Sequence, residues 1–173
     1  FGEMSEPASR SAHLAVWWVH SLMVFGFFAM IPFTRLLHLI TGPANLFFST
    51  PSLGQLKPIS IEEVEETGVV GVSEIAHLDQ QQLLSLDACM ECGRCDDACP
   101  AFASGKPLSP KAVVQDLKSL MEATANGESL ALHGDTIQAE TVWSCTSCNA
   151  CVTACPVRVD PLGLLFELRR NLA

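Results

Sequence analysis

The first apolar stretch of the chain is Leu14–Ile31, and within it only His20 and Ser21 are polar. Eighteen residues of α-helix rise roughly 27 Å, at about 1.5 Å each, which is close to the hydrocarbon thickness of a bilayer. The apolar core of a secretory signal peptide is shorter than this. The pattern therefore predicts a transmembrane helix, and the alternative is a buried core helix of a soluble protein.

The predicted helix is expected to continue beyond this stretch to about Ile40. Pro32 should kink it, because proline has no N–H and its ring clashes with the preceding turn. The sequence Thr41-Gly42-Pro43 should end it, since glycine suits the first position after a helix and proline cannot continue one.

Residues 44–78 have a different character, because prolines and glycines separate short apolar runs. Gln55–Ile61 and Val69–Ile75 are candidates for the strands of a short β-ribbon. Between them lies an acidic cluster, interpreted as a solvated face rather than a docking patch. The cluster comprises Glu62, Glu63, Glu65 and Glu66. Residues 43–78 are therefore predicted to be a linker.

The pattern is helical from Asp79 onward. Asp79 is a candidate N-cap for a helix that ends near Ala88. Ser109-Pro110 and Asp160-Pro161 predict two further helix starts, because Ser and Asp cap free N–H groups and Pro fits the first helical position. Lys111–Ala125 has the period of an amphipathic helix. Its apolar positions, expected to face the core, are Val114, Leu117, Leu120 and Met121.

Eight cysteines form two blocks with the same spacing, Cys-x2-Cys-x2-Cys-x3-Cys-Pro. Each cysteine of the second block lies 56 positions after its counterpart in the first, so the blocks are an internal repeat. Three cysteines separated by two residues each let one tight loop wrap three corners of an iron–sulfur cubane. In the first loop, the small residue Gly93 is expected to leave room for inorganic sulfide.

The fourth cysteine of each block lies too far along the chain to complete its own cube easily. In two-cluster proteins with this run, it ligates the other cluster. We therefore predict two [4Fe–4S] clusters that exchange their fourth ligands. The first cluster is expected to be bound by Cys89, Cys92, Cys95 and Cys155, and the second by Cys145, Cys148, Cys151 and Cys99.

Two other roles for the cysteines are disfavoured. A zinc site needs four tetrahedral ligands, commonly from two cysteine pairs, and has no use for a third cysteine at the same interval. A disulfide framework would spread its cysteines along the chain, usually in a secreted protein. The predicted fold class is thus mainly α, with a transmembrane helix in residues 1–42, the linker, and a two-cluster helical ferredoxin-like domain in residues 79–173.

His20 and His38 are a second candidate site. Their separation of 18 residues is five whole turns of a regular helix, so both would face one side, about 27 Å apart. Polar residues at membrane depth are usually functional, and imidazole is a common axial ligand of haem iron. Two b-type haems are therefore a tentative prediction, with the opposite ligands supplied by another helix. The alternative for His20 is an interhelical hydrogen bond.

Two neighbouring residues bear on the haem prediction. His13 lies near the same helical stripe and is interpreted as an interfacial polar residue. Arg35 lies one turn before His38, where it would either pair with a haem propionate or extend its charged end to the membrane interface.

Both ends of the chain resemble known families. Pro32–His38 (PFTRLLH), with His20 eighteen residues earlier, resembles the last haem-bearing helix of the cytochrome b subunit of respiratory nitrate reductases. In that family the corresponding histidines are axial ligands of two b-type haems. Ala88–Cys95 (ACMECGRC) and Gly105–Pro110 (GKPLSP) resemble the iron–sulfur subunits of heterodisulfide reductases and the helical ferredoxin domain of succinate dehydrogenases.

The fusion of these parts is similar to membrane-bound heterodisulfide-reductase-related proteins, which the resemblance links to quinones. The cytochrome family has about five transmembrane helices, whereas one is predicted here, and the helix with the opposite haem ligands is missing. The cysteine-rich catalytic domain of the heterodisulfide-reductase family is also missing. We therefore expect a fragment of a longer protein, or a subunit that borrows helices.

Composition and charge narrow the setting. Charged residues make up only 17% of the chain, below the roughly 25% of a typical soluble domain. A net charge of −9 opposes binding to nucleic acid, and 49% apolar residues oppose disorder. Arg10 precedes the predicted span, whereas Arg35 and Lys57 lie toward its other end. This charge difference and the thiols favour the cytoplasmic membrane, with the cluster domain on the cytoplasmic side.

The predicted function is membrane-bound electron transfer through two [4Fe–4S] clusters and b-type haem, between a soluble redox partner and the quinone pool. Expected partners are the membrane and other transmembrane helices, or a missing part of the same polypeptide. One alternative is the iron–sulfur subunit of a dehydrogenase for a hydroxy acid or glycerol phosphate. Another is a non-redox, membrane-anchored metal-binding module. No Gly-rich nucleotide loop or Ser/His/Asp set indicates a complete substrate site.

Overall fold

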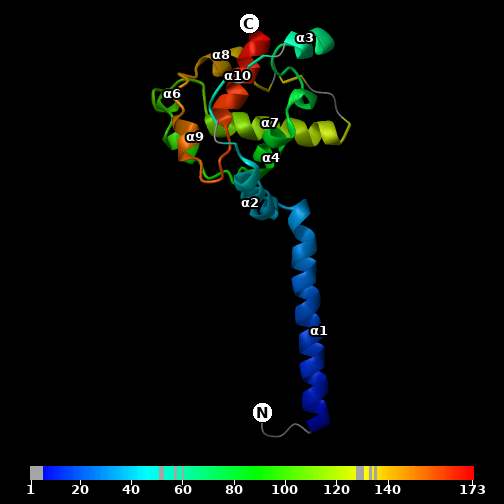
Figure 1. Ribbon diagram of the computed structural model, residues 1–173. Coiled ribbons are helices and arrows are strands. Elements are labelled where there is room, and N and C mark those ends of the chain that lie inside the picture. Colours follow the sequence, from blue (N-terminus) through cyan, green and yellow to red (C-terminus); the bar gives the residue numbers. More distant parts are fainter. Residues whose placement is uncertain are drawn as a thin grey trace. The chain divides into compact units, whose positions relative to one another are not determined.

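A computed structural model describes residues 6–50, 53–56, 58–59, 61–127, 131–132, 134 and 136–173 (Figure 1). Within these residues the regular structure is helical and contains no strand, so the predicted mainly α fold class is confirmed. The chain divides into two units, Phe1–Leu37 and His38–Ala173. Each unit is described by itself.

The first unit is dominated by α1, Glu6–Met30. Two 3₁₀ turns follow it, η1 (Ile31–Phe33) and η2 (Arg35–Leu37). Glu6–Phe33 is long and apolar enough to cross a membrane, and no side chain of α1 is buried. This exposure is unlike that of a core helix in a soluble protein, and it is what a lipid-facing helix requires.

The predicted continuous helix from Leu14 to about Ile40 is wrong. The α-helix ends at Met30, and a separate helix, α2, occupies His38–Phe48. Pro32 lies at the start of η1, where its missing N–H removes a bond that would continue the α-helix. The chain then becomes extended at Thr34, so Pro32 accompanies a break rather than a kink.

The predicted stop at Thr41-Gly42-Pro43 is also wrong, because α2 continues through all three residues. Thr41 Oγ1 donates a hydrogen bond to the carbonyl oxygen of Asp87, at 2.9 Å. A Cβ atom at position 42 would lie 3.4 Å from Val157 Cγ1, so the helix backbone comes close to the domain there. These contacts stabilise a helix that the local sequence alone would end.

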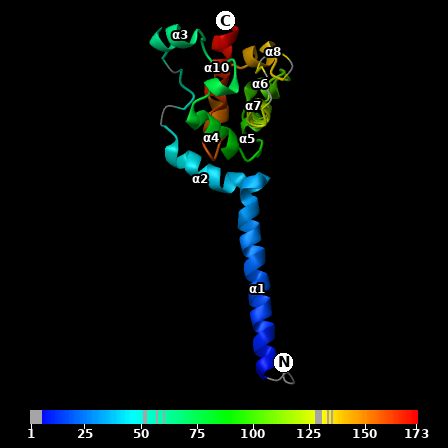
Figure 2. The same ribbon diagram turned by 90° about the vertical axis from the view of Figure 1, so that its right-hand side faces the viewer.

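Three longer helices build the second unit. They are α4 (Gln80–Ala88), α7 (Pro110–Ala125) and α10 (Pro161–Leu172). Figures 1 and 2 show α7 crossing α10, and both helices contribute to one apolar core. The fully buried side chains of this core include Leu86, Leu117 and Leu165.

All three predicted N-caps are confirmed. The Asp79 carboxylate accepts from Gln82 N, the Ser109 hydroxyl from Ala112 N, and the Asp160 carboxylate from Gly163 N. The predicted amphipathic helix 111–125 is α7, which starts one residue earlier at Pro110. Its predicted core positions are buried, except that Met121 is partly exposed.

The predicted β-ribbon is wrong. Ile61–Thr67 forms a helix, α3, and no described residue between 55 and 75 is in a strand. Val72 N donates to the carbonyl oxygen of Glu167 in α10, so this segment bonds to a helix instead of a neighbouring strand. Gly71 has φ +74°, and a Cβ atom there would lie 2.4 Å from the same carbonyl oxygen. A further 3₁₀ turn, η3, spans Ile75–His77.

Candidate metal centre

The two cysteine loops share one backbone conformation. Glu91 and Ser147, which lie at equivalent positions, have φ values of 55° and 56°. Gly93 and Asn149 are also equivalent, and both are left-handed N-caps with φ values of 80° and 63°. Left-handed backbone favours Gly and Asn, which gives a conformational reason for these residue types. The sequence repeat is therefore a structural repeat.

Each loop leads into a short helix that carries the third thiol of its block. These helices are α5 (Arg94–Asp97) and α9 (Ala150–Ala154). Residues of α5 and α9 contact each other. The first block then continues into α6, Pro100–Ala103. The contact between α5 and α9 brings the two blocks together even though 56 positions separate them in sequence.

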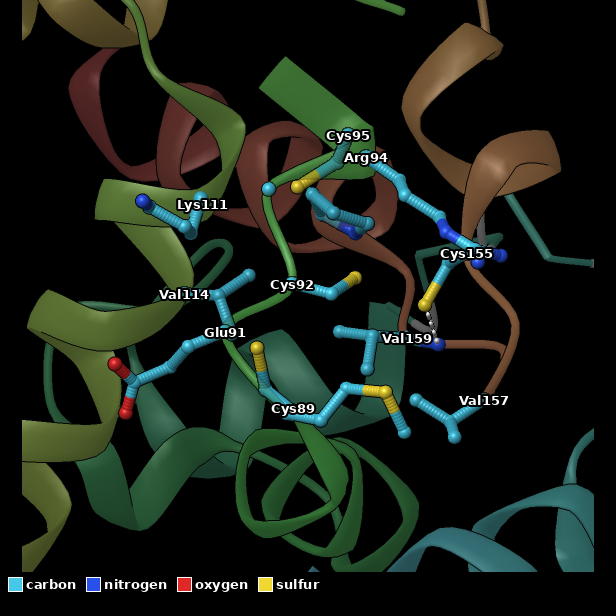
Figure 3. Close-up of a pocket in the computed structure, with 13 residues that line it drawn as sticks. Cys89, Glu91, Cys92, Arg94, Cys95, Lys111, Val114, Cys155, Val157 and Val159 are labelled. Atoms are coloured by element: carbon cyan, nitrogen blue, oxygen red, sulfur yellow. Dashed lines mark hydrogen bonds between the residues drawn. The ribbon is translucent and has the colours of Figure 1, made fainter. Parts of the chain in front are cut away.

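The first group of thiols surrounds a pocket in the second unit. Cys89, Cys92 and Cys95 reach it from the first loop, and Cys155 reaches it from the second block (Figure 3). Apolar side chains complete much of the wall, among them Val114, Val157 and Val159. The fourth cysteine of the second block thus lies with the three cysteines of the first.

The second group contains the other four thiols. Burial raises the pKa of the Cys151 thiol to about 12. The electrostatic neighbours that raise it further are Cys145, Cys99 and Cys148. Cys99 is itself buried, whereas Cys148 is exposed. A hydrogen bond from the Ala150 amide lowers the pKa of the Cys148 thiol.

Burial also raises the pKa of two thiols in the first group. The pKa of Cys95 is raised to about 11, chiefly by burial and then by the nearby Asp96 charge. The pKa of Cys89 is raised by burial, which outweighs hydrogen bonds that act in the opposite direction. Thiolates are the form that binds iron, so cluster binding releases protons from these sites.

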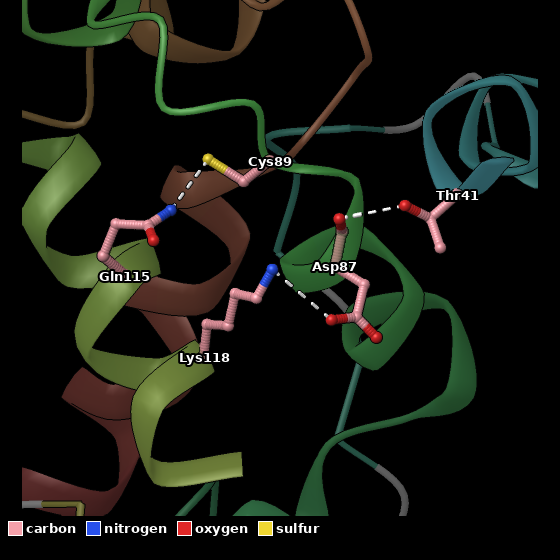
Figure 4. Close-up of polar contacts among 5 residues, drawn as sticks. All are labelled: Thr41, Asp87, Cys89, Gln115 and Lys118. Atoms are coloured by element: carbon pink, nitrogen blue, oxygen red, sulfur yellow. Dashed lines mark hydrogen bonds and ion pairs between the residues drawn. The ribbon is translucent and has the colours of Figure 1, made fainter. Parts of the chain in front are cut away.

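N–H donors point at sulfur atoms in both groups. Gln115 Nε2 donates to Cys89 Sγ at 3.2 Å (Figure 4). Backbone amides make the other three such contacts, which are Val159 to Cys155 at 3.3 Å, Ser147 to Cys145 at 3.4 Å and Phe102 to Cys99 at 3.5 Å. Hydrogen bonds to cluster sulfurs stabilise negative charge and influence the reduction potential. Thiols, apolar walls and N–H donors together fit [4Fe–4S] clusters.

Asp96 is a positioning residue that the sequence analysis missed. Its side chain is buried, and its two oxygens accept from Ser109 Oγ at 2.8 Å and from Lys111 N at 2.9 Å. The carboxylate therefore joins the first cysteine loop to the start of α7. The equivalent residue of the second block is Val152, so a break in the repeat was the available signal.

Arg169 positions the second loop and was also missed. Its guanidinium donates from α10 to the carbonyl oxygens of Val142 and Cys145 and to Ser147 Oγ. It also lies over the Trp143 ring, 5.2 Å from the centroid, at the end of α8 (Ala139–Trp143). One side chain thus joins α8, the second loop and α10.

The helix α2 lies beside the first group of thiols. Asn45 is fully buried, and its Nδ2 donates to the carbonyl oxygens of Val157 at 2.7 Å and Arg158 at 3.3 Å. Gln81 Nε2 donates to Asn45 Oδ1 at 2.6 Å. Because Val157 lines the first pocket, α2 contacts the loop that carries Cys155.

The structure does not bring the predicted haem residues onto one helix. His20 lies in α1 of the first unit, and His38 is the first residue of α2 in the second. The argument from five whole helical turns therefore does not hold, because the helix is interrupted between them. Arg35 lies in the intervening turn η2.

Comparison with known families decides the class of the cysteine region. Residues 85–159 match the 4Fe-4S dicluster domain family. The matched segment, called the dicluster domain below, contains all eight cysteines. The match supports iron–sulfur clusters and the iron–sulfur part of the sequence resemblance.

Curated relatives extend the likeness beyond the dicluster domain. An EtfAB:quinone oxidoreductase of Syntrophomonas wolfei is 33% identical, over 99% of this chain and 28% of the relative. A Chromohalobacter salexigens protein described as "Probable membrane-anchored ferredoxin" is 35% identical, over 68% of this chain and 20% of the relative. An Archaeoglobus profundus protein that is like one of the subunits of heterodisulfide reductase is 28% identical, over 64% of this chain and 62% of the relative.

These relatives are iron–sulfur redox proteins by description, and two of them are much longer than this chain. The chain spans 28% of the first relative and 20% of the ferredoxin. No solved structure matches the chain.

Proposed function

We propose that this chain transfers electrons between a membrane redox centre and a soluble partner. The observation that carries the proposal is the exchange of fourth cysteines, which places Cys155 with the first triplet and Cys99 beside Cys151. When bound, two [4Fe–4S] clusters supply one-electron redox chemistry. The exchange, together with the contact between α5 and α9, would hold the clusters near each other, as a relay requires.

The protein's own residues have three tasks in this proposal. The eight thiolates bind the clusters, in the sets Cys89, Cys92, Cys95, Cys155 and Cys145, Cys148, Cys151, Cys99. Valine side chains around the first pocket limit access of water. Gln115 and the backbone amides orient N–H dipoles toward sulfur, which favours the more negatively charged state.

The membrane side of the proposal rests on α1. Its length, apolar composition and exposure support a transmembrane anchor, and the description of one relative as a membrane-anchored ferredoxin agrees. We assign His20 and His38 to b-type haem, each needing a second ligand from another helix, with Arg35 near a propionate. Quinone is the proposed membrane partner, in keeping with the description of the Syntrophomonas relative. The dicluster domain is placed on the cytoplasmic side.

Two spectroscopic measurements on the purified, membrane-reconstituted chain test the proposal. Low-temperature electron paramagnetic resonance after reduction should show two interacting [4Fe–4S] clusters. Zinc content without such signals would contradict electron transfer and favour a structural metal module. A reduced-minus-oxidised optical spectrum should show b-type haem, expected when the helices with the opposite ligands are present. His20→Ala and His38→Ala should each remove one haem, and unchanged haem content would contradict the assignment.

A further inference from the structure

The outer face of α2 is apolar and exposed. Asn45 and Gly42 face the dicluster domain, and Phe47 lies on the opposite side of the helix because two residues correspond to about 200°. Phe47 is 83% exposed. The other exposed apolar side chains of this helix are Leu39, Ile40, Leu46 and Phe48. None of the residues of α2 is Asp, Glu, Lys or Arg.

This face is the reverse of an ordinary surface helix. A helix on a soluble domain buries its apolar side and exposes its polar side. Here Thr41 and Asn45 are used for hydrogen bonds to the domain, and the aromatic and aliphatic side chains point away from it. An exposed apolar patch of this kind marks a contact with a membrane or another protein.

The chain itself indicates the membrane. The candidate span ends at Phe33, and α2 begins at His38. The four intervening residues allow at most roughly 17 Å between these points, even when fully extended. An uncharged helix with Phe and Leu on its free side, held this close to the end of a span, matches an interfacial helix.

We infer that the face formed by Leu39, Ile40, Leu46, Phe47 and Phe48 lies in the interfacial layer of the bilayer that α1 crosses. The inference rests on the proposed membrane anchoring of α1. The occupant of the face is lipid, and α2 thereby holds the Cys155–Val159 loop toward the membrane surface.

Tryptophan fluorescence with brominated lipids tests this inference on the full chain with its clusters. The background is Trp17→Phe with Trp18→Phe, which leaves Trp143 in the dicluster domain. One variant adds Phe47→Trp. Its matched control adds Phe102→Trp, on α6, at a side chain that is 46% exposed. Each protein is reconstituted in phosphatidylcholine vesicles, with and without bromine on the acyl chains.

The added emission of Phe47→Trp should be quenched at least twofold more than that of Phe102→Trp, and more strongly by bromine near the headgroups than by bromine near the chain ends. Equal quenching of the two variants would overturn the inference, as would a blue-shifted Phe47→Trp emission without lipid quenching, which indicates a protein partner. The native chain separates the two levels of the argument. Quenching of Trp17 and Trp18 reports insertion of α1, and its absence would refute the anchor itself.

Discussion

Single thiols show how the two repeats share their ligands. Cys155 lies in the pocket of the first triplet, so Cys155→Ser should damage the first cluster. Its electron paramagnetic resonance spectrum should therefore match that of Cys92→Ser. Cys99→Ser should instead match Cys148→Ser. If Cys155→Ser matched Cys148→Ser, each block would bind its own cluster, and exchange of ligands would be refuted.

The hydrogen bond from Gln115 to Cys89 should influence the first cluster's reduction potential. Gln115→Leu removes a donor that stabilises the more negative reduced state, so the potential should fall. The expected shift is on the order of 50 mV, since about 1 kcal/mol per hydrogen bond corresponds to roughly 43 mV for one electron. A redox titration followed by electron paramagnetic resonance measures it. Gln138→Leu, at the exposed N-cap of α8, is the control and should leave the potential unchanged.

At the scale of elements, Asp96 fixes the start of α7 against the first cysteine loop. Asp96→Ala leaves Lys111 N and Ser109 Oγ without their buried acceptor, at a cost of about 1–3 kcal/mol. Cluster absorbance should therefore be lost several degrees lower on heating. Asp97→Ala removes a neighbouring exposed carboxylate and should lose its clusters at the wild-type temperature. An equal shift in both variants would show a general charge effect instead.

Local signals allowed the helix starts to be predicted. Asp79, Ser109 and Asp160 each cap the helix that immediately follows, and such contacts span only three residues. The break after Met30 and the continuation of α2 through Pro43 were not predictable in this way, because Asn45 and Gly42 act through contacts with a loop more than 100 positions away.

The candidate site shows the same division. The cysteine spacing was sufficient to predict cluster chemistry, because three thiols in one tight loop are a local pattern. Gln115 and Arg169 could not be found from sequence, since their roles depend on which loop lies beside α7 and α10. Gln115 also sits next to the apolar positions of α7, where its amide gives no periodic signal.

At the scale of the whole molecule, the contacts of α2 predict the order of the two clusters. The helix touches the loop that follows Cys155, so the first cluster should be nearer the membrane than the second. Lipids with gadolinium-chelating headgroups should therefore speed the spin relaxation of the first cluster more. Cys148→Ser and Cys92→Ser proteins assign the signals, because each is expected to keep one intact cluster. Stronger relaxation of the cluster retained in Cys92→Ser would reverse the order.

The exchange of fourth cysteines has a consequence for synthesis of the chain on the ribosome. With the thiols grouped as the structure places them, the four cysteines made first, Cys89 to Cys99, do not form a complete ligand set. The first complete set appears only with Cys151, and the other only with Cys155. By then α1, more than 100 residues earlier, has long since left the ribosome. Iron–sulfur assembly therefore follows membrane targeting, and a chain truncated before Cys151 would present six thiols without a finished site for either cluster.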